Sequence, residues 1–395
     1  MIRLKNPATP KTIYFDNAAT TFPKPPSVVE ATLRGIREYS GNPGRGGHSI
    51  SRKAAEALYT LRVDAAEFFG SAKEENVVIT QNTTHSMNLA LRALLRYGDS
   101  VLCSNLEHNA VRRVLLSLRS SKNVRISTFD GLLPDAELLE SMERSIKKEK
   151  IDLVVLPHAS NVCSRVLPLS EIGKMCRRHS VLLVVDGAQS AGHVPTHFDK
   201  FGIDALCLSG HKGLYSPPGI GLLMISDRFK ERAARSEVLI TGGAGVDSLD
   251  EDMPSVFPER FEAGTISAPL CHSLSAGIKF IKGIGIEKVA EKELLLGNYA
   301  RNILLRYPGV VLYAPDYRGG IISFNLEGIP PERAAEYFDS RGICMRAGLH
   351  CAPSAHESLG SLFSFGGTLR MSFGVFNTLH ELDLFERALR DITLK

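Results

Sequence analysis

The sequence of 395 residues lacks an apolar run long enough to cross a bilayer. Its longest apolar runs, residues 151–156 and 181–185, fall far short of the roughly 18 residues that a membrane-spanning helix needs. The first residues, MIRLKNPATPKTIYFDN, contain no apolar core of a secretory signal. We therefore expect a protein with no membrane partner and a cytoplasmic location.

Cysteine pairs with disulfide or metal-binding spacing are also missing. The seven cysteines are odd in number, scattered and without a C-x-x-C pair, which favours free thiols in a reducing compartment. The 47 Lys and Arg nearly balance the 43 Asp and Glu, and the net charge of +4 gives no support for a nucleic acid partner. No repeat or low-complexity segment is present, so the composition is that of an ordinary globular protein.

What the chain does contain is an alternation of short apolar runs with helical patterns. Apolar residues at helical spacing predict helices over 49–69 and 84–97, closed by Gly70 and Gly98. Strands that alternate with helices imply βαβ units and a mostly parallel sheet. The predicted strands, most of them apolar on both faces as in a covered sheet, are 77–80, 101–104, 124–127, 152–156, 181–186, 205–209 and 220–225.

The pattern changes after about residue 270. Long helical patterns are followed by short strands, which is typical of a smaller α+β domain. We therefore expect a large domain over residues 15–270 and a small domain over 271–395, on which residues 1–14 are free to pack. The expected elements of the small domain are helices at 270–283, 286–307, 331–341 and 379–394 and strands at 310–313 and 321–325.

Polar side chains follow the carboxyl ends of the predicted strands, where ligands bind in open α/β sheets. Each alone is more readily explained as a cap, a turn residue or a surface charge. Together they supply an acid, a lysine and a hydroxyl-rich helix start, which pyridoxal phosphate requires for its ring nitrogen, Schiff base and phosphate. These residues are Gln81–Thr84, Glu107, His108, His158, Asn161, Asp186, Gln189, Ser209, His211 and Lys212.

Three of these residues have side chains whose chemistry suits a particular role toward the cofactor. A carboxylate at Asp186 would keep the ring nitrogen protonated, so that the ring can accept electrons. Lys212 is flanked by His211 and two glycines, which permits close approach, and local positive potential would lower its pKa. His108 is suited to lie on the ring or to relay a proton near neutral pH.

Seven segments resemble those of class V aminotransferase-type pyridoxal phosphate enzymes, and most closely the cysteine desulfurase/selenocysteine lyase branch. They are YFDNAATT, GNPGRGGHSIS, EHNAV, HASNV, VDGAQSAG, SGHKG and RAGLHCAP, in the family's order, and the resemblance covers residues 14–377. The resemblance implies the fold-type-I architecture, with a seven-stranded, mostly parallel sheet and a smaller C-terminal α+β domain. It also implies a homodimer, an amino-acid substrate and a sulfur-acceptor protein.

The resemblance also assigns roles to individual residues. It implies that Lys212 forms the Schiff base, that Asp186 holds the ring nitrogen and that His108 stacks on the ring. Arg370 matches the arginine that clamps the substrate carboxylate, for which a planar fork is suited. Gln189 and Asn161 would flank the ring hydroxyl, the phosphate would lie on Thr83, Thr84, Ser209 and His211, and Thr265 would reach the phosphate of the neighbouring subunit.

Cys351 distinguishes between subfamilies. Its segment resembles that of the second group of cysteine desulfurases, in which this cysteine accepts the sulfur. Arg346 and His350 are placed to lower the pKa of its thiol. The alternative is that Cys351 is a small buried side chain without a catalytic role, as most free cysteines are. Ligation of a metal by His350, Cys351 and His356 matches no usual zinc spacing, so we expect no metal.

The sequence departs from the family pattern at Leu349, where a second histidine is common, and at His85, where Glu or Ala is usual. The loop after Lys212 also reads Ser216-Pro217-Pro218. Arg45 and His48 lie in a glycine-rich loop that the resemblance places near the active site, and we expect both to contact the substrate.

These observations predict a cysteine desulfurase. It would convert L-cysteine, or L-selenocysteine, to L-alanine and pass the sulfur to Cys351 as a persulfide. The alternatives are another class V enzyme, such as an aminotransferase or epimerase with an idle Cys351, and a binding module without turnover. The joint presence of Asp186, Lys212 and Arg370 disfavours the binding module.

Overall fold

The computed structural model describes residues 12–44, 46–246 and 249–393. They form two compact units, each described here by itself. Among the described residues, the small unit contains 12–22, Asn161–Arg165 and 290–393. The large unit contains Pro23–Ser160 and Val166–Val289.

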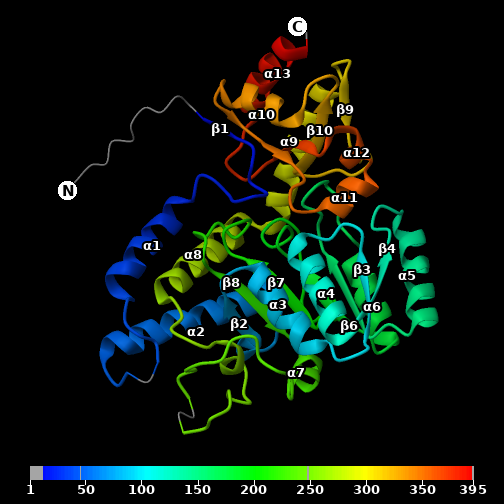
Figure 1. The fold of residues 1–395 in the computed structure, drawn as a ribbon. Helices are drawn as coiled ribbons and strands as arrows, with labels where there is room; N and C mark the ends of the chain where they lie inside the picture. Colours follow the sequence, from blue (N-terminus) through cyan, green and yellow to red (C-terminus); the bar gives the residue numbers. More distant parts are fainter. Residues whose placement is uncertain (1–11, 45, 247–248, 394–395) are drawn as a thin grey trace. The chain divides into compact units, whose positions relative to one another are not determined.

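A seven-stranded sheet forms the centre of the large unit (Figure 1). In spatial order its strands are β2 (Val77–Thr80), β8 (Gly221–Ile225), β7 (Ala205–Ser209), β6 (Leu182–Asp186), β5 (Leu153–Pro157), β3 (Ser100–Ser104) and β4 (Arg125–Phe129). The strands β7, β6, β5, β3 and β4 are parallel, and β8 runs antiparallel to both of its neighbours. The predicted fold class is therefore confirmed.

Helices cover both faces of this sheet because successive strand residues point to opposite sides. In β3, Val101 packs into one apolar cluster and Leu102 into the other. One face carries α3 (Thr83–Leu94), α4 (Asn109–Lys122) and α7 (Asp227–Ala233), the first two in front of the sheet in Figure 1. The other carries α2 (Ser49–Phe69), α5 (Asp135–Glu149), α6 (Leu169–Arg178) and α8 (Ala268–Ile284), and α1 (Pro26–Glu38) packs on α8.

Two of the predicted helices can be compared with the structure at their ends. Helix α2 has the predicted bounds, because the His48 ring accepts a hydrogen bond from the Ser51 N–H and Gly70 ends the helix at a φ of 66°. Helix α3 ends three residues earlier than predicted. Leu95 is buried and extended, and its carbonyl accepts a hydrogen bond from Lys122 Nζ at 2.9 Å.

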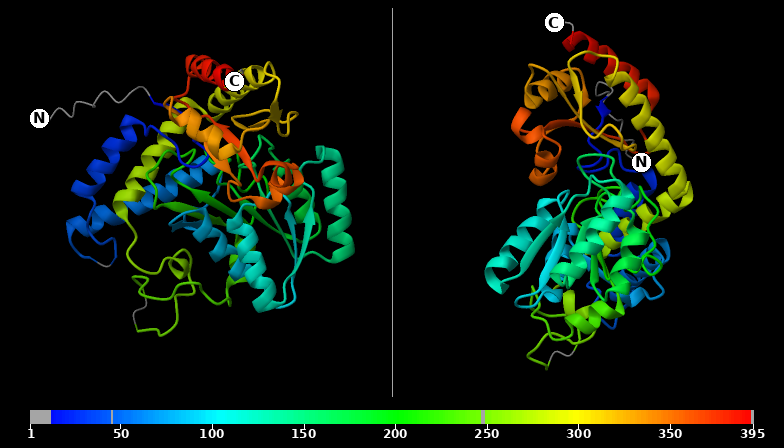
Figure 2. Two further views of the ribbon diagram at one scale, coloured as in Figure 1. Left: turned by 45° about the horizontal axis from the view of Figure 1, so that its top comes forward. Right: turned by 90° about the vertical axis from the view of Figure 1, so that its right-hand side faces the viewer.

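The small unit is built on a four-stranded antiparallel sheet of β12 (Arg346–Gly348), β13 (Thr368–Ser372), β10 (Ile321–Leu326) and β9 (Val310–Leu312). The strand β1 (Ile13–Tyr14) pairs with β11 (Ile343–Cys344). Helices α9 (Ile286–Leu304), α10 (Pro331–Asp339) and α13 (Leu379–Thr393) bury a core with Phe15, Phe324 and Phe385, and α9 and α13 lie side by side in Figure 2.

The remaining elements are short: α11 (Pro353–Ser358) and α12 (Ser361–Phe365) in the small unit, and η1 (Glu74–Asn76) and η2 (Glu259–Phe261) in the large one. Among the residues the structure describes, no helix combines the length and the apolar character that crossing a membrane requires.

Candidate active site

The carboxyl edge of the large sheet gathers most of the predicted cofactor residues. Asp186 is the last residue of β6, and Lys212 follows the end of β7 by three residues. Because β6 and β7 are parallel neighbours, with Asp186 in register with Cys207, both residues leave the sheet at the same edge. His158 follows β5, and Glu107 follows β3 further along the same edge.

The start of α3 presents hydroxyl groups. The Thr83 N–H donates to Ser209 Oγ at 3.0 Å, and the two hydroxyl oxygens are 2.8 Å apart. Asn82 caps the helix by accepting from the His85 N–H at 3.0 Å, and Thr84 is exposed. Paired hydroxyls at a helix N-terminus are suited to a phosphate group.

The loop that carries Lys212 packs tightly against the loop after β6. Gly192 has a φ of 81°, and a Cβ on it would lie 2.2 Å from the Gly213 carbonyl oxygen. Lys24 Nζ donates to the His211 carbonyl at 3.1 Å, and burial lowers the pKa of Lys24 to about 8. Burial, followed by the charges of Lys212 and Lys24, lowers the pKa of His211 to about 4, so its ring is neutral at pH 7.

Asp186 is buried, with 5% of its surface exposed. Its Oδ1 accepts from the Ala188 N–H at 2.9 Å, and its carbonyl accepts from the His158 N–H at 3.0 Å. Gln189, three residues on, is also buried. Because a buried carboxylate is costly unless it has a donor or a cation beside it, Asp186 fits the protonated nitrogen of a pyridine ring.

Glu107 and His108 stand at the start of α4. The His108 Nδ1 accepts from the Ala110 N–H at 3.0 Å, so the proton of the neutral ring is on Nε2. Glu107 Oε1 accepts from the Ser104 N–H at 3.2 Å, and its buried Oε2 has no hydrogen-bond partner among the described residues. Burial, and then the charge of Asp186, raise the pKa of Glu107 well above its usual range.

In the small unit, Arg370 on β13 is buried, with 2% of its surface exposed. Its Nη2 donates to Asp16 Oδ1 and its Nη1 donates to the Asn161 carbonyl, both at 2.9 Å. The Asn161 side-chain amide donates to the His350 carbonyl at 2.7 Å. Sequence reasoning missed Asp16, although it lies in the quoted segment YFDNAATT, because its partner Arg370 is 354 residues away.

Cys351 is the exposed one of the seven cysteines, all of which lie in the described part of the chain. His350 and Cys351 have left-handed φ values of 48° and 57°, so the thiol stands at a sharp turn. The His350 ring is buried and shares a hydrogen bond of 3.0 Å with Thr368 Oγ1.

Burial, followed by the charge of Arg370, lowers the pKa of His350 to about 2. The ring is therefore neutral, which differs from our expectation that it would lower the pKa of the neighbouring thiol. Arg346, the other expected cation, lies 3.5 Å from Asp16 Oδ2. His356 is buried, with its Nδ1 2.8 Å from Ser361 Oγ, and within the described ranges no group of three suitable side chains is placed to hold a metal ion.

The remaining predicted residues are Thr265, His48 and Arg45. Thr265 is exposed and, with His85, lines a cavity of about 240 Å³ that also touches Gln81, just beyond β2. His48 caps α2, and Arg45 lies outside the described residues.

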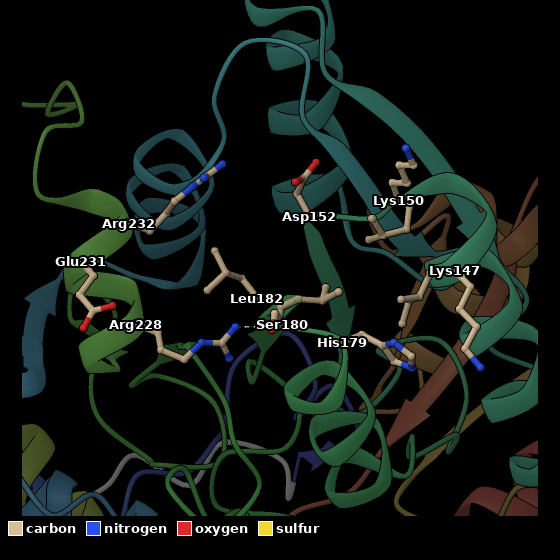
Figure 3. A pocket seen from close by; sticks show the side chains of 12 residues that line it. Lys147, Lys150, Asp152, His179, Ser180, Leu182, Arg228, Glu231 and Arg232 are labelled. Carbon is tan, nitrogen blue, oxygen red and sulfur yellow. Dashed lines mark hydrogen bonds between the residues drawn. The ribbon is translucent and has the colours of Figure 1, made fainter.

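A larger cavity of about 650 Å³ lies at the opposite, amino edge of the sheet, before β5 and β6 (Figure 3). Both of its arginines are engaged in ion pairs: Arg228 pairs with Asp204 at 3.2 Å, and Arg232 pairs with Asp99 at 2.6 Å. Since ligands of open α/β sheets bind at the carboxyl edge, we take that edge of the large unit, and not this cavity, as the candidate cofactor site.

Known proteins share this fold and chain length. The Aminotransferase class-V family matches residues 13–385. A probable cysteine desulfurase of Pyrococcus abyssi is 33% identical over an alignment of 402 residues, gaps included, which covers 99% of this chain and 96% of the relative. The apo cysteine desulfurase of Thermococcus onnurineus NA1 is 32% identical with a TM-score of 0.86 over 97% of this chain and 95% of that one. The Escherichia coli cysteine desulfurase CsdA is 27% identical, with a TM-score of 0.83 over 97% and 94% of the two chains.

The chain therefore belongs to the aminotransferase class-V family. The predicted resemblance to this family and to its cysteine desulfurases is confirmed.

Proposed function

We propose that this chain is a pyridoxal phosphate-dependent cysteine desulfurase, which converts L-cysteine, or L-selenocysteine, to L-alanine and transfers the sulfur to Cys351. Relatives named cysteine desulfurase match it over nearly its whole length. The observation that carries the proposal is the exposed Cys351 on a sharp turn, because the other six cysteines are buried or partly buried.

The residues present fit pyridoxal phosphate. Thr83, Ser209 and the neutral His211 would hold the phosphate, Asp186 the ring nitrogen, and Lys212 the aldehyde carbon. His108, Gln189, Asn161 and Thr84 are further proposed contacts. When bound, the cofactor supplies an electron sink that makes bonds at the substrate α-carbon labile.

The chain's own residues would perform the remaining steps. Arg370 binds the substrate carboxylate, and Lys212 Nζ removes the proton from the α-carbon and later returns it. The Cys351 thiolate attacks the substrate sulfur, so that an S–S bond forms as the C–S bond breaks. The electron pair of the C–S bond remains on the β-carbon, which takes a proton and becomes the methyl group of alanine.

We also propose a homodimer, a cytoplasmic location and a separate protein that accepts the sulfur from Cys351. An exposed apolar stripe on α1 supports the homodimer, since Val29, Leu33 and Ile36 share one face and are about half exposed. Thr265 would reach the partner's phosphate, and Arg45 and His48 would contact substrate. The division into domains of residues 15–270 and 271–395 likewise stays a proposal.

The direct test is incubation of the purified holoenzyme with L-cysteine and a thiol reductant, without any keto acid. We expect alanine and sulfide in equal amounts. The Cys351→Ala variant should keep the visible absorbance of bound cofactor and lose sulfide release, whereas Lys212→Ala should lose the normal absorbance. Alanine formation that requires a keto acid would instead indicate an aminotransferase.

A further inference from the structure

The guanidinium of Arg370 is held on two of its three nitrogens. Nη2 donates to Asp16 Oδ1, and Nη1 donates to the Asn161 carbonyl. The third, Nε, is buried and has no hydrogen-bond partner among the described residues. Because Nη2 carries two N–H bonds and one suffices for Asp16, Nε and Nη2, the two nitrogens of one guanidinium edge, each have an N–H left for a further acceptor.

Such an edge matches a carboxylate that binds with both oxygens. Burial lowers the pKa of Arg370, while the charge and hydrogen bond of Asp16 oppose that shift. Asp16 therefore favours the charged guanidinium and fixes its rotation about the side chain.

Asp16 is itself held in place by the strand that carries Arg370. It forms a parallel bridge with Ser372, the last residue of β13. The following residues reinforce this attachment, since the Ala18 N–H donates to Ser372 Oγ at 2.8 Å and the Asn17 side-chain amide donates to the Ser372 carbonyl at 3.1 Å. The Asp16 carboxylate thus has a fixed position from which to orient Arg370.

The same hydrogen bonds extend to the cysteine loop. Asn161 accepts from Arg370 through its carbonyl and donates to the His350 carbonyl through its side chain. His350 directly precedes Cys351 at the left-handed turn. Asn161 therefore links Arg370 to the turn that carries the Cys351 thiol through two hydrogen bonds.

We propose that Asp16 is a positioning residue, which orients Arg370 so that its Nε–Nη2 edge receives the α-carboxylate of the amino-acid substrate. This inference rests on the proposed function and adds a residue to which no role was assigned. The role of Asp16 is exerted through Arg370, to which it is hydrogen-bonded.

The test compares ligands with and without a carboxylate. In the Asp16→Asn holoenzyme, we expect the KM for L-cysteine to rise roughly tenfold with kcat changed less than about threefold, since one charge-assisted hydrogen bond is weakened. The dissociation constant of L-alanine, measured from the absorbance of bound cofactor, should rise in parallel. That of cysteamine, which lacks the carboxylate, should stay within about twofold of the wild-type value.

Two further variants complete the experiment. Asp16→Glu, which retains a carboxylate, should recover part of the lost L-alanine affinity. Asp316→Asn makes the same chemical change at an exposed aspartate of the small unit and should match the wild type. Equal losses for L-alanine and cysteamine, or no loss for either, would overturn the proposal. A wild-type enzyme that forms no alanine from L-cysteine would instead refute the proposed function.

Discussion

Single residues at the carboxyl edge of the large sheet were predictable where a strand ends in a polar side chain. Asp186, Ser209 and Lys212 follow apolar runs in the sequence, so their positions required only the strand assignments. The ionisation of two further groups was not predictable. Glu107 and His350 are perturbed mainly by burial, which depends on segments distant in the sequence.

His158 provides a prediction at this scale. It is 3% exposed, its Nδ1 lies 3.1 Å from Thr196 Oγ1, and burial lowers its pKa to about 4. Well above pH 6.5 the ring is neutral in both folded and unfolded chains and adds no pH dependence. Between pH 6.5 and 4 the unfolded chain binds a proton that the folded one does not, so the unfolding free energy falls as pH falls, by at most roughly 3 kcal/mol.

The measurement is urea unfolding of the wild type and of His158→Asn at pH 7.5 and pH 5. We expect the wild type to lose more stability than the variant between these two pH values. Equal losses would show that His158 does not contribute to acid sensitivity.

At the scale of elements, the strands of the large sheet were predictable and those of the small sheet only in part. Most of the large-sheet strands are apolar on both faces, which gives a strong sequence signal. The strands β12 (RAG) and β13 (TLRMS) are short and contain arginines, so their assignment depends on pairing with each other and with β10. The substrate-clamp candidate Arg370 was therefore found by resemblance and not by pattern.

The contact between the loops after β6 and β7 gives a prediction at this scale. A Gly192→Ala substitution would place a Cβ 2.2 Å from the Gly213 carbonyl oxygen, at a φ of 81°. We expect a loss of about 1–3 kcal/mol in unfolding free energy and weaker cofactor binding, because the Lys212 loop must shift.

Gly98→Ala is the matched control for this substitution. Gly98 has a φ of 80°, but a Cβ there would meet nothing within 4 Å. The Gly98→Ala variant should lose some unfolding free energy, because alanine is strained at this φ, and should bind the cofactor as well as the wild type does. If both variants bind pyridoxal phosphate equally well, close packing of the two loops is not needed to place Lys212.

At the scale of the whole molecule, the family was predictable because its seven segments are spread along the chain in a fixed order. The hydrogen bonds that join Arg370 to Asp16 and Asn161 in the small unit were not predictable, since the three residues lie far apart in the sequence. No local pattern reports such pairs.

The exposed stripe on α1 predicts the behaviour of the molecule in solution. We expect the wild type to have twice the chain mass of 43.1 kDa by light scattering, and Leu33→Asp to be monomeric. Tyr97→Asp is the matched control, because Tyr97 is 78% exposed and lies away from α1 in the sequence. A monomeric wild type would contradict the proposed homodimer.

The most direct test of sulfur transfer is to locate the sulfur after a single turnover. The holoenzyme is mixed with one equivalent of L-cysteine without reductant, alkylated, digested and analysed by peptide mass. We predict one additional sulfur atom on the Cys351 peptide and an equal amount of alanine. Alanine formed in full with no added sulfur on Cys351, or with the sulfur on another cysteine, would contradict the account.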